Sequence, residues 1–341
     1  MKTKHLVIIL ILLILMILYV FGSVQKIGKP YIYGSVIKTI NLPQASNPVW
    51  PLLAPDGKYV YVTAAYSNNI SIIATSNDTI VGKIFVGYGS DGISAITPNG
   101  EYMYVTNFNL SISSNTVSVI STSNKTLVDF IHVGNDPISI AITPDGKYAY
   151  VTNGASNTIS VISTSNNTVI ANVSIGGEPI EVGITPDSAH AYITDYNTGH
   201  VSVISTSNNT VIGNIRVGDA PIGVVIAPNG EYAYVSNSGS NTISVISISN
   251  NTIVKNISVR YKPQTIIIAP NGRYLYTVSS SNESSASNEV TIISTSNNTV
   301  VDNVPVANTP AGIAIAPDGG RLYVATIDLP TVTVIALNNS G

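Results

Sequence analysis

The sequence predicts an all-β fold of seven four-stranded antiparallel sheets, and three observations support this. A Pro-[Asp/Asn]-[Gly/Ser] turn recurs every 42 to 47 residues, beginning at Pro55, Pro98, Pro144, Pro186, Pro228, Pro270 and Pro317. Each interval holds four segments rich in β-branched and aromatic residues. No segment after Gly22 has a 3.6-residue apolar period. A period in the forties with four strands per unit is typical of a β-propeller, here with seven blades.

One unit shows how the strands are assigned. Residues 137–176 read "PISIAITPDGKYAYVTNGASNTISVISTSNNTVIANVSIG". Asp-Gly and Ser-Asn-Asn turns divide the unit into four strands, which are A (Ile138–Thr143), B (Tyr148–Asn153), C (Thr158–Ser163) and D (Thr168–Ile175). Strands A and C are apolar on both faces in places, as expected for strands packed between neighbouring sheets.

The two ends of the repeat array complement each other. The last unit stops after its C strand, "TVTVIAL", while "GSVIKTINL" at Gly34–Leu42 matches a D strand without a unit of its own. We therefore expect the N-terminal strand to complete the C-terminal blade, which removes open sheet edges. The predicted propeller covers residues 34–341.

An apolar segment precedes the array. Lys2 and Lys4 are followed by Leu6–Phe21, in which the Tyr19 hydroxyl is the one polar group. The segment is short for a spanning helix and long for the core of a signal peptide. Residues 1–23 are thus predicted to form a hydrophobic helix, either a cleavable signal or a membrane anchor through residues 6–24, with 24–33 as a linker. We expect the uncleaved anchor, because no A-x-A-like cleavage site follows.

The composition argues against several function classes. The net charge is −3, 10% of residues are charged, and there is no basic run, so a nucleic-acid partner is not expected. The chain has no cysteine, and its four histidines are scattered without ligand spacing. The glycines recur at turns rather than in a nucleotide-binding loop. We expect no catalytic residues, no metal site and no cofactor.

Strand B carries a recurring tetrapeptide. "YVTN" stands at Tyr104–Asn107 and Tyr150–Asn153, with relatives "YITD" at Tyr192, "YVSN" at Tyr234 and "YVAT" at Tyr323. With the Pro-Asp-Gly turns and "TVSVIST"-like strands, residues 34–341 resemble the YVTN-type β-propeller repeat family. This resemblance implies an exported or cell-surface propeller, as in archaeal surface-layer-like proteins. It says little about function, because propellers include enzymes, scaffolds and binding platforms.

The two faces of the predicted propeller differ in variability. With strand A along the central channel, D–A and B–C connections share one face, here called the loop face, and A–B and C–D connections share the other, the turn face. Length changes fall on the loop face, in B–C connections at 107–114 and 279–288 and in D–A connections at 43–50 and 88–91. Variation on one face of a repeat array is typical of a working surface, although neutral drift in exposed loops gives the same pattern.

The D–A loops supply the candidate ligand-binding residues. Carboxylates occur on four successive blades, at Asp91, Asp136, Glu178 and Asp219. Aromatic and cationic residues fall in the equivalent loops of other blades, at Trp50, Tyr88, Arg260, Tyr261 and Lys262. Carboxylates opposite aromatic and cationic groups suit a sugar, a peptide or a cation. The alternative for each is an ordinary solvated loop residue.

The C–D turns carry N-glycosylation sequons. One candidate falls in each blade, at Asn77, Asn124, Asn166, Asn208, Asn250, Asn297 and Asn338, and others stand at Asn69, Asn109, Asn172, Asn256 and Asn282. Turn chemistry alone explains Asn at such positions. In an exported chain, however, twelve sequons also predict that some carry glycans.

Three functions fit these observations. The first is a non-enzymatic cell-surface module, membrane-anchored or secreted if the leader is cleaved, that binds protein or glycan through its loop face. The second is an exported propeller enzyme, such as a lactonase-like hydrolase, or an electron-transfer partner subunit. The third is a structural part of a surface coat. The sequence favours the first, because no His/Arg/carboxylate cluster recurs at repeat-equivalent positions.

Overall fold

The computed structural model describes residues 33–43, 47–65, 67–86, 92–108, 114–279, 288–307 and 309–338. The predicted hydrophobic helix and most of the predicted linker lie outside these residues. The described residues belong to one compact unit, Tyr33–Gly341.

The described residues contain twenty-eight strands, which form seven sheets, called blades 1 to 7 in chain order. Blade 1 contains β2 (Asn47–Leu53), β3 (Tyr59–Ala65), β4 (Asn69–Ala74) and β5 (Thr79–Phe85). Blade 2 contains β6 (Ser94–Ile96), β7 (Tyr102–Thr106), β8 (Thr116–Ser121) and β9 (Thr126–His132). Blade 3 contains β10 (Pro137–Ile142), β11 (Tyr148–Asn153), β12 (Thr158–Ser163) and β13 (Thr168–Ser174). Blade 4 contains β14 (Pro179–Ile184), β15 (His190–Asp195), β16 (His200–Ser205) and β17 (Thr210–Arg216). Blade 5 contains β18 (Pro221–Ile226), β19 (Tyr232–Asn237), β20 (Thr242–Ser247) and β21 (Thr252–Ser258). Blade 6 contains β22 (Pro263–Ile268), β23 (Tyr274–Ser279), β24 (Glu289–Ser294) and β25 (Thr299–Pro305). Blade 7 contains β26 (Pro310–Ile315), β27 (Arg321–Thr326), β28 (Thr331–Leu337) and β1 (Gly34–Asn41).

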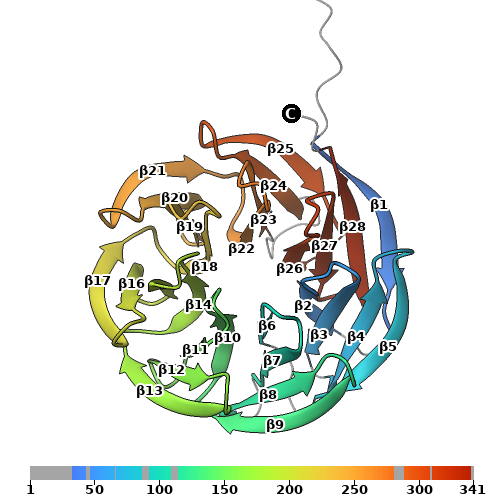
Figure 1. Ribbon diagram of the computed structural model, residues 1–341. Helices are drawn as coiled ribbons and strands as arrows, with labels where there is room; N and C mark the ends of the chain where they lie inside the picture. The colour runs from blue at the N-terminus through green and yellow to red at the C-terminus, as the bar shows by residue number, and fades with distance from the viewer. Residues whose placement is uncertain are drawn as a thin grey trace, which may run out of the picture. The chain divides into compact units, whose positions relative to one another are not determined.

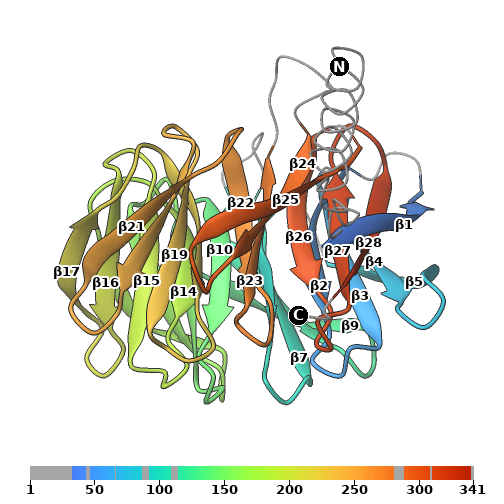
Figure 2. The same cartoon turned by 90° about the horizontal axis from the view of Figure 1, so that it is seen from above.

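The sheets stand around a central axis as a seven-bladed β-propeller, as the sequence predicts. The A strands β2, β6, β10, β14, β18, β22 and β26 lie nearest the centre, and the D strands lie on the circumference (Figure 1). Viewed from the side, the strands of each blade run between two faces that hold the connections (Figure 2). This arrangement separates the loop face from the turn face.

The N-terminal strand closes the ring. β1 pairs antiparallel with β28 from Gly34↔Leu337 to Asn41↔Thr331, with a bulge between Val36 and Lys38. Ile40 and the adjacent Leu42 are buried in a cluster that joins blade 7 to Val60 and Val62 of blade 1. The predicted closure of the C-terminal blade by the N-terminal strand is therefore confirmed.

The apolar core lies between blades rather than in one central mass. Seven buried clusters occur, one at each junction between neighbouring blades. At the junction of blades 3 and 4, for example, Ile159 and Val161 pack with Val182 and Ile193. Because each sheet is apolar on both faces of its inner strands, it can bury surface against both neighbours at once.

Each residue of the "YVTN" tetrapeptide on strand B makes its own contact, as blade 3 shows. The Tyr150 hydroxyl donates to Asn209 Oδ1 of the next blade at 2.7 Å. Val151 is fully buried in the core. The Thr152 hydroxyl donates across the junction to the Ile180 carbonyl at 2.8 Å, and Asn153 donates to Thr158 and Ser160 within its own blade. The motif therefore joins each blade to the next while tying strand B to strand C.

Candidate binding surfaces

The structure places most predicted ligand residues in D–A loops. Asp136, Glu178 and Asp219 precede β10, β14 and β18, and residues 260–262 precede β22. The expectation that Trp50 lies in a loop is wrong: it lies within β2. Tyr88 and Asp91 lie outside the described residues.

Trp50 can lie in a strand because Pro48 and Pro51, which flank it, are compatible with the pairing of β2 with β3. Pro48 is opposite Ala64 and Pro51 is opposite Val62, with a register shift between them. Bulges and first strand positions tolerate the missing N–H of proline. A Cβ on Gly312 of blade 7 would stand 2.7 Å from Cε3 of the indole, so the glycine leaves room for Trp50 beside the innermost strand of the neighbouring blade.

The three described carboxylates make local contacts. Asp219 forms an ion pair with Arg216 at 3.0 Å, with both side chains largely exposed. Glu178 accepts a hydrogen bond from Asn197 at 3.3 Å. Asp136 has a left-handed backbone (φ 54°), and its main-chain carbonyl accepts a hydrogen bond from the Gly154 N–H. No hydrogen bond or ion pair joins one of these carboxylates to another within the described part of the chain, so they form a series of separate polar points around the loop face.

The cationic loop before β22 has a buried carboxyl near it. The Arg260 guanidinium lies 4.9 Å from the centre of the Tyr261 ring, a cation–π contact, while Lys262 is exposed. Burial raises the pKa of Glu289, although the positive charge of Arg260 opposes the shift. Glu289 is not among the predicted ligand residues. It occupies the first strand-C position, which Thr116, Thr158 and Thr242 hold in other blades.

A second missed carboxyl lies on an innermost strand. Glu181 is in β14, and its Oε2 is enclosed without a hydrogen-bond partner. Burial raises the pKa of Glu181 to about 8, with the backbone N–H of Val224 acting in the opposite direction. The equivalent residues of the other blades are Trp50, Ile93, Ser139, Gly223, Thr265 and Gly312. Aligning the repeats would have revealed Glu181, because no other blade has an ionisable residue there.

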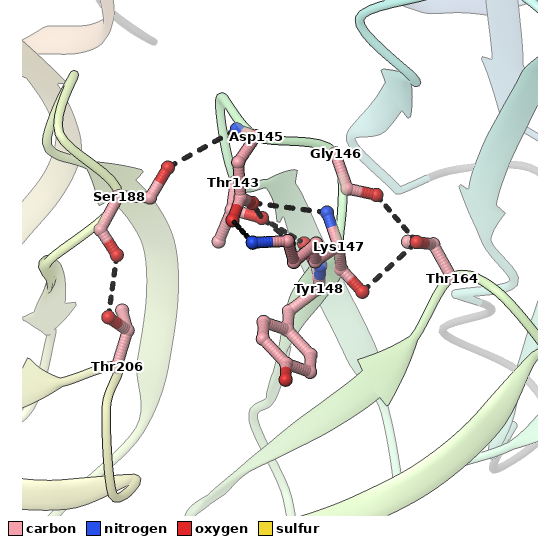
Figure 3. A network of polar contacts seen from close by, with 8 residues as sticks. All are labelled: Thr143, Asp145, Gly146, Lys147, Tyr148, Thr164, Ser188 and Thr206. Carbon is pink, nitrogen blue, oxygen red and sulfur yellow. Dashed lines mark hydrogen bonds and ion pairs between the residues drawn. The ribbon is translucent and has the colours of Figure 1, made fainter.

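The turn face is built from a repeated hydrogen-bond network (Figure 3). In blade 3, the Thr143 hydroxyl donates to Asp145 at 2.6 Å, which lowers the pKa of that carboxyl. The Thr164 hydroxyl ties the C–D turn to the A–B turn through the Gly146 carbonyl at 2.5 Å. The Asp145 N–H donates to Ser188 of the next blade at 3.2 Å. The short polar turns therefore stiffen this face within and between blades.

The sequons occupy a uniform geometry. Their asparagines are exposed at Asn77, Asn124, Asn166, Asn208, Asn250, Asn297 and Asn338. In five C–D turns the sequon Thr donates to the Asn Oδ1 at 2.8 Å. The middle residue has a left-handed backbone, with φ between 52° and 58°. Asn tolerates this conformation better than most residues, so the turn explains the repeated "SNNT" by itself, and glycan occupancy stays a prediction.

Among the residues that the structure describes, no group of three or more His, Asp or Glu side chains is placed to hold a metal ion. The same described ranges contain no helix with the length and apolar character needed to cross a membrane.

Comparison with known proteins shows the fold of this chain and no family. By architecture it is a seven-bladed propeller protein with a uniform turn face and a variable loop face. It is similar to a chain of Kuenenia stuttgartiensis hydrazine synthase, with a TM-score of 0.75 and 23% identity over 90% of this chain and 99% of that one. At this identity the likeness shows the fold alone. No family model and no curated protein matches, so membership of the YVTN-type family stays a prediction.

Proposed function

We propose that this protein is an exported, non-enzymatic module that binds a protein or glycan at the cell surface through its loop face. Connection lengths carry this proposal. All seven A–B connections have five residues and all six C–D connections have four, whereas B–C connections range from three to nine and D–A connections from four to eight. A rigid repeat scaffold with variable loops on one face is the usual design of a binding surface.

The loop face also offers the chemistry that such binding needs. Asp136, Glu178 and Asp219 supply hydrogen-bond acceptors, and the stacked Arg260–Tyr261 pair supplies a flat cationic surface. Tyr and Arg are the residue types that most often dominate binding energy at protein interfaces. Export and anchoring rest on the apolar leader and the sequons. The YVTN resemblance supports the same location.

Capture from intact cells tests the function. The purified full chain, carrying a photo-crosslinker, is compared with a variant in which the nine-residue B–C connection 107–115 is replaced by the four-residue connection 154–157 of blade 3. A matched control exchanges the C–D turn 206–209 for 248–251 on the opposite face. We expect the loop variant to lose the captured partner and the control to keep it. Equal capture by all three proteins contradicts the proposal.

The competing function is an exported enzyme or electron-transfer partner, and the structural neighbour is a chain named for an enzyme. Profiling the purified chain against lactone and ester substrates separates the two functions. Substrate turnover that survives the loop replacement would favour the enzyme.

A further inference from the structure

Neighbouring blades are linked on the turn face by a tyrosine clasp. The strand-B tyrosine of one blade donates its hydroxyl to the middle sequon residue in the C–D turn of the next blade. Four junctions have this bond, Tyr104–Asn167 at 2.7 Å, Tyr150–Asn209 at 2.7 Å, Tyr192–Asn251 at 2.6 Å and Tyr323–Asp78 at 3.0 Å. The clasp therefore ties strand B of one blade to the C–D turn of the next.

Three junctions have the tyrosine without the clasp. At the junction of blades 6 and 7, Tyr276 has no partner turn, because blade 7 takes β1 as its D strand and has no C–D turn of its own. The other two junctions have the turn but not the bond. Between blades 1 and 2, Tyr61 faces a turn in which Lys125 holds the middle position, and a lysine side chain offers no acceptor. Lys125 Nζ lies instead 5.4 Å from the centre of the Tyr59 ring. Between blades 5 and 6, the equivalent residue is Asn298, whose Oδ1 is enclosed without a partner. Within the described residues no hydrogen bond engages the hydroxyl of Tyr61 or Tyr234.

A pocket lies at each of these two junctions. One has a volume of about 450 Å³ and the other about 440 Å³, within the ~300–1,000 Å³ typical of small-ligand sites. Their linings are repeat-equivalent: Tyr232 and Tyr234 in one correspond to Tyr59 and Tyr61 in the other. The same backbone thus makes two similar pockets where the clasp is missing.

The walls combine tyrosine side chains with polar rims. Tyr232 and Tyr59 are partly exposed, whereas Tyr234 and Tyr61 are buried. The rings of Tyr232 and Tyr234 have centroids 6.4 Å apart and planes inclined at 47°. Asn229 and Glu231 line the same pocket and are themselves hydrogen-bonded at 2.8 Å. Burial raises the pKa of Tyr234 to about 12, so its hydroxyl is a protonated donor at neutral pH.

We propose that the two pockets are subsites for pyranose rings of a saccharide, on the face opposite the loop face and independent of the function proposed for that face. The electron-rich face of a partly exposed tyrosine ring, such as that of Tyr232, attracts the weakly positive C–H groups of a sugar. The carboxylate and amide rim accepts hydrogen bonds from sugar hydroxyls. A proline-rich peptide also packs on aromatic rings, but it has few N–H donors for an acidic rim, so the saccharide fits better.

The test titrates the purified full chain with N,N′-diacetylchitobiose, α1,2-mannobiose and cellobiose by calorimetry, and with decaproline in parallel. Production in a bacterial host without N-glycosylation keeps the pockets free of the protein's own glycans. We expect at least one disaccharide to bind with a stoichiometry of two. Tyr61→Phe combined with Tyr234→Phe should weaken binding about 2- to 10-fold, since each change removes one neutral hydrogen bond.

A matched pair of variants separates binding from folding. Tyr104→Phe with Tyr150→Phe removes hydroxyls that are already clasped, so it should leave disaccharide binding unchanged while lowering the melting temperature. Lys125→Asn offers Tyr61 the acceptor that Asn167, Asn209 and Asn251 supply at clasped junctions, so it should weaken binding at the Tyr61 pocket by engaging that hydroxyl. Binding that is equal in the Tyr61/Tyr234 variant and the wild type overturns the proposal. So does the absence of binding by all three disaccharides, with or without decaproline binding.

Discussion

At the scale of single residues, a few side chains affect stability through ionisation or hydrogen bonds as well as packing. Glu181 has a carboxyl oxygen enclosed without a partner on an innermost strand, and burial raises the pKa of Glu181 from 4.5 to about 8. A carboxyl whose pKa is raised in the folded state binds its proton more tightly there than in the unfolded chain. Its contribution to stability is therefore full below pH 4.5 and is lost as the pH rises toward 8.

Glu181→Gln should consequently change stability in a pH-dependent way. The glutamine keeps the shape of a protonated carboxyl and cannot ionise. We expect the variant to match the wild type at pH 4 and to gain on it by up to about 1.4 kcal/mol for each pH unit between 4.5 and 8. Urea unfolding at pH 4, 6 and 8 measures this gain, with Glu101→Gln on an exposed turn as the control. A difference that is constant with pH would show that Glu181 does not titrate in this range.

Thr152 tests the cross-blade role of the tetrapeptide. Its hydroxyl accepts the Ser139 N–H at 2.9 Å and donates to the Ile180 carbonyl at 2.8 Å. Thr152→Val keeps the volume but leaves two buried backbone groups without this partner, so we expect a loss of about 1–3 kcal/mol in unfolding free energy. Thr126→Val, at an exposed β-strand position whose hydroxyl makes no hydrogen bond within the described part of the chain, should stay within about 0.5 kcal/mol. Similar losses in both variants would indicate that β-strand threonines matter for reasons other than this bond.

At the scale of strands and turns, the C–D turn sets both local shape and cross-blade contact. Lys125 holds a left-handed backbone with φ 58°, a conformation that favours Asn. Lys125→Asn should relieve this strain and give Tyr61 an acceptor, at the cost of the contact between Lys125 and Tyr59. We expect a net gain of about 0.5–1 kcal/mol. Thermal unfolding of Lys125→Asn with and without Tyr61→Phe checks it, because the gain should largely vanish when the hydroxyl is absent.

The element boundaries show what the sequence can predict. Strands B and C of blade 3 match the prediction residue for residue, because Asp-Gly and Ser-Asn-Asn turns mark their ends. Strand A begins and ends one residue earlier than predicted, at Pro137 and Ile142, and Pro137 pairs with Asn153 although it lacks an N–H. Strand D and the closing strand each end one residue earlier than predicted, at Ser174 and Asn41. Proline and strand ends are the places where side-chain pattern gives least information about pairing.

At the scale of the whole molecule, the repeat period determines the architecture but not the sites. Seven turns and complementary ends are enough to predict the ring, since each blade repeats one pattern. The pockets at Tyr61 and Tyr234 lie at junctions that lack the hydroxyl bond between blades, and at Tyr61 the acceptor is replaced by Lys125. The lysine at position 125 is visible in the sequence. Its consequence appears only when the next blade is placed beside it.

The closing strand offers the last prediction. β1 covers the edge of β28 through seven paired positions. The adjoining Tyr33 N–H donates to Asp302 at 3.1 Å, and Lys38 Nζ donates to the Asn77 carbonyl at 2.7 Å. This short segment therefore contacts blades 6, 7 and 1, so its removal should weaken three blades at once.

A chain beginning at residue 43 is compared with one beginning at Tyr33, both without the leader. Loss of Ile40 and Leu42 burial alone should cost roughly 3–6 kcal/mol. The uncovered β28 presents a row of unpaired N–H and C=O groups to other molecules, which promotes aggregation. We expect the shorter chain to melt at a lower temperature and to elute as oligomers in size-exclusion chromatography. A monomer with unchanged melting would mean that blade 7 is stable with three strands and that closure by β1 is not what holds the ring together.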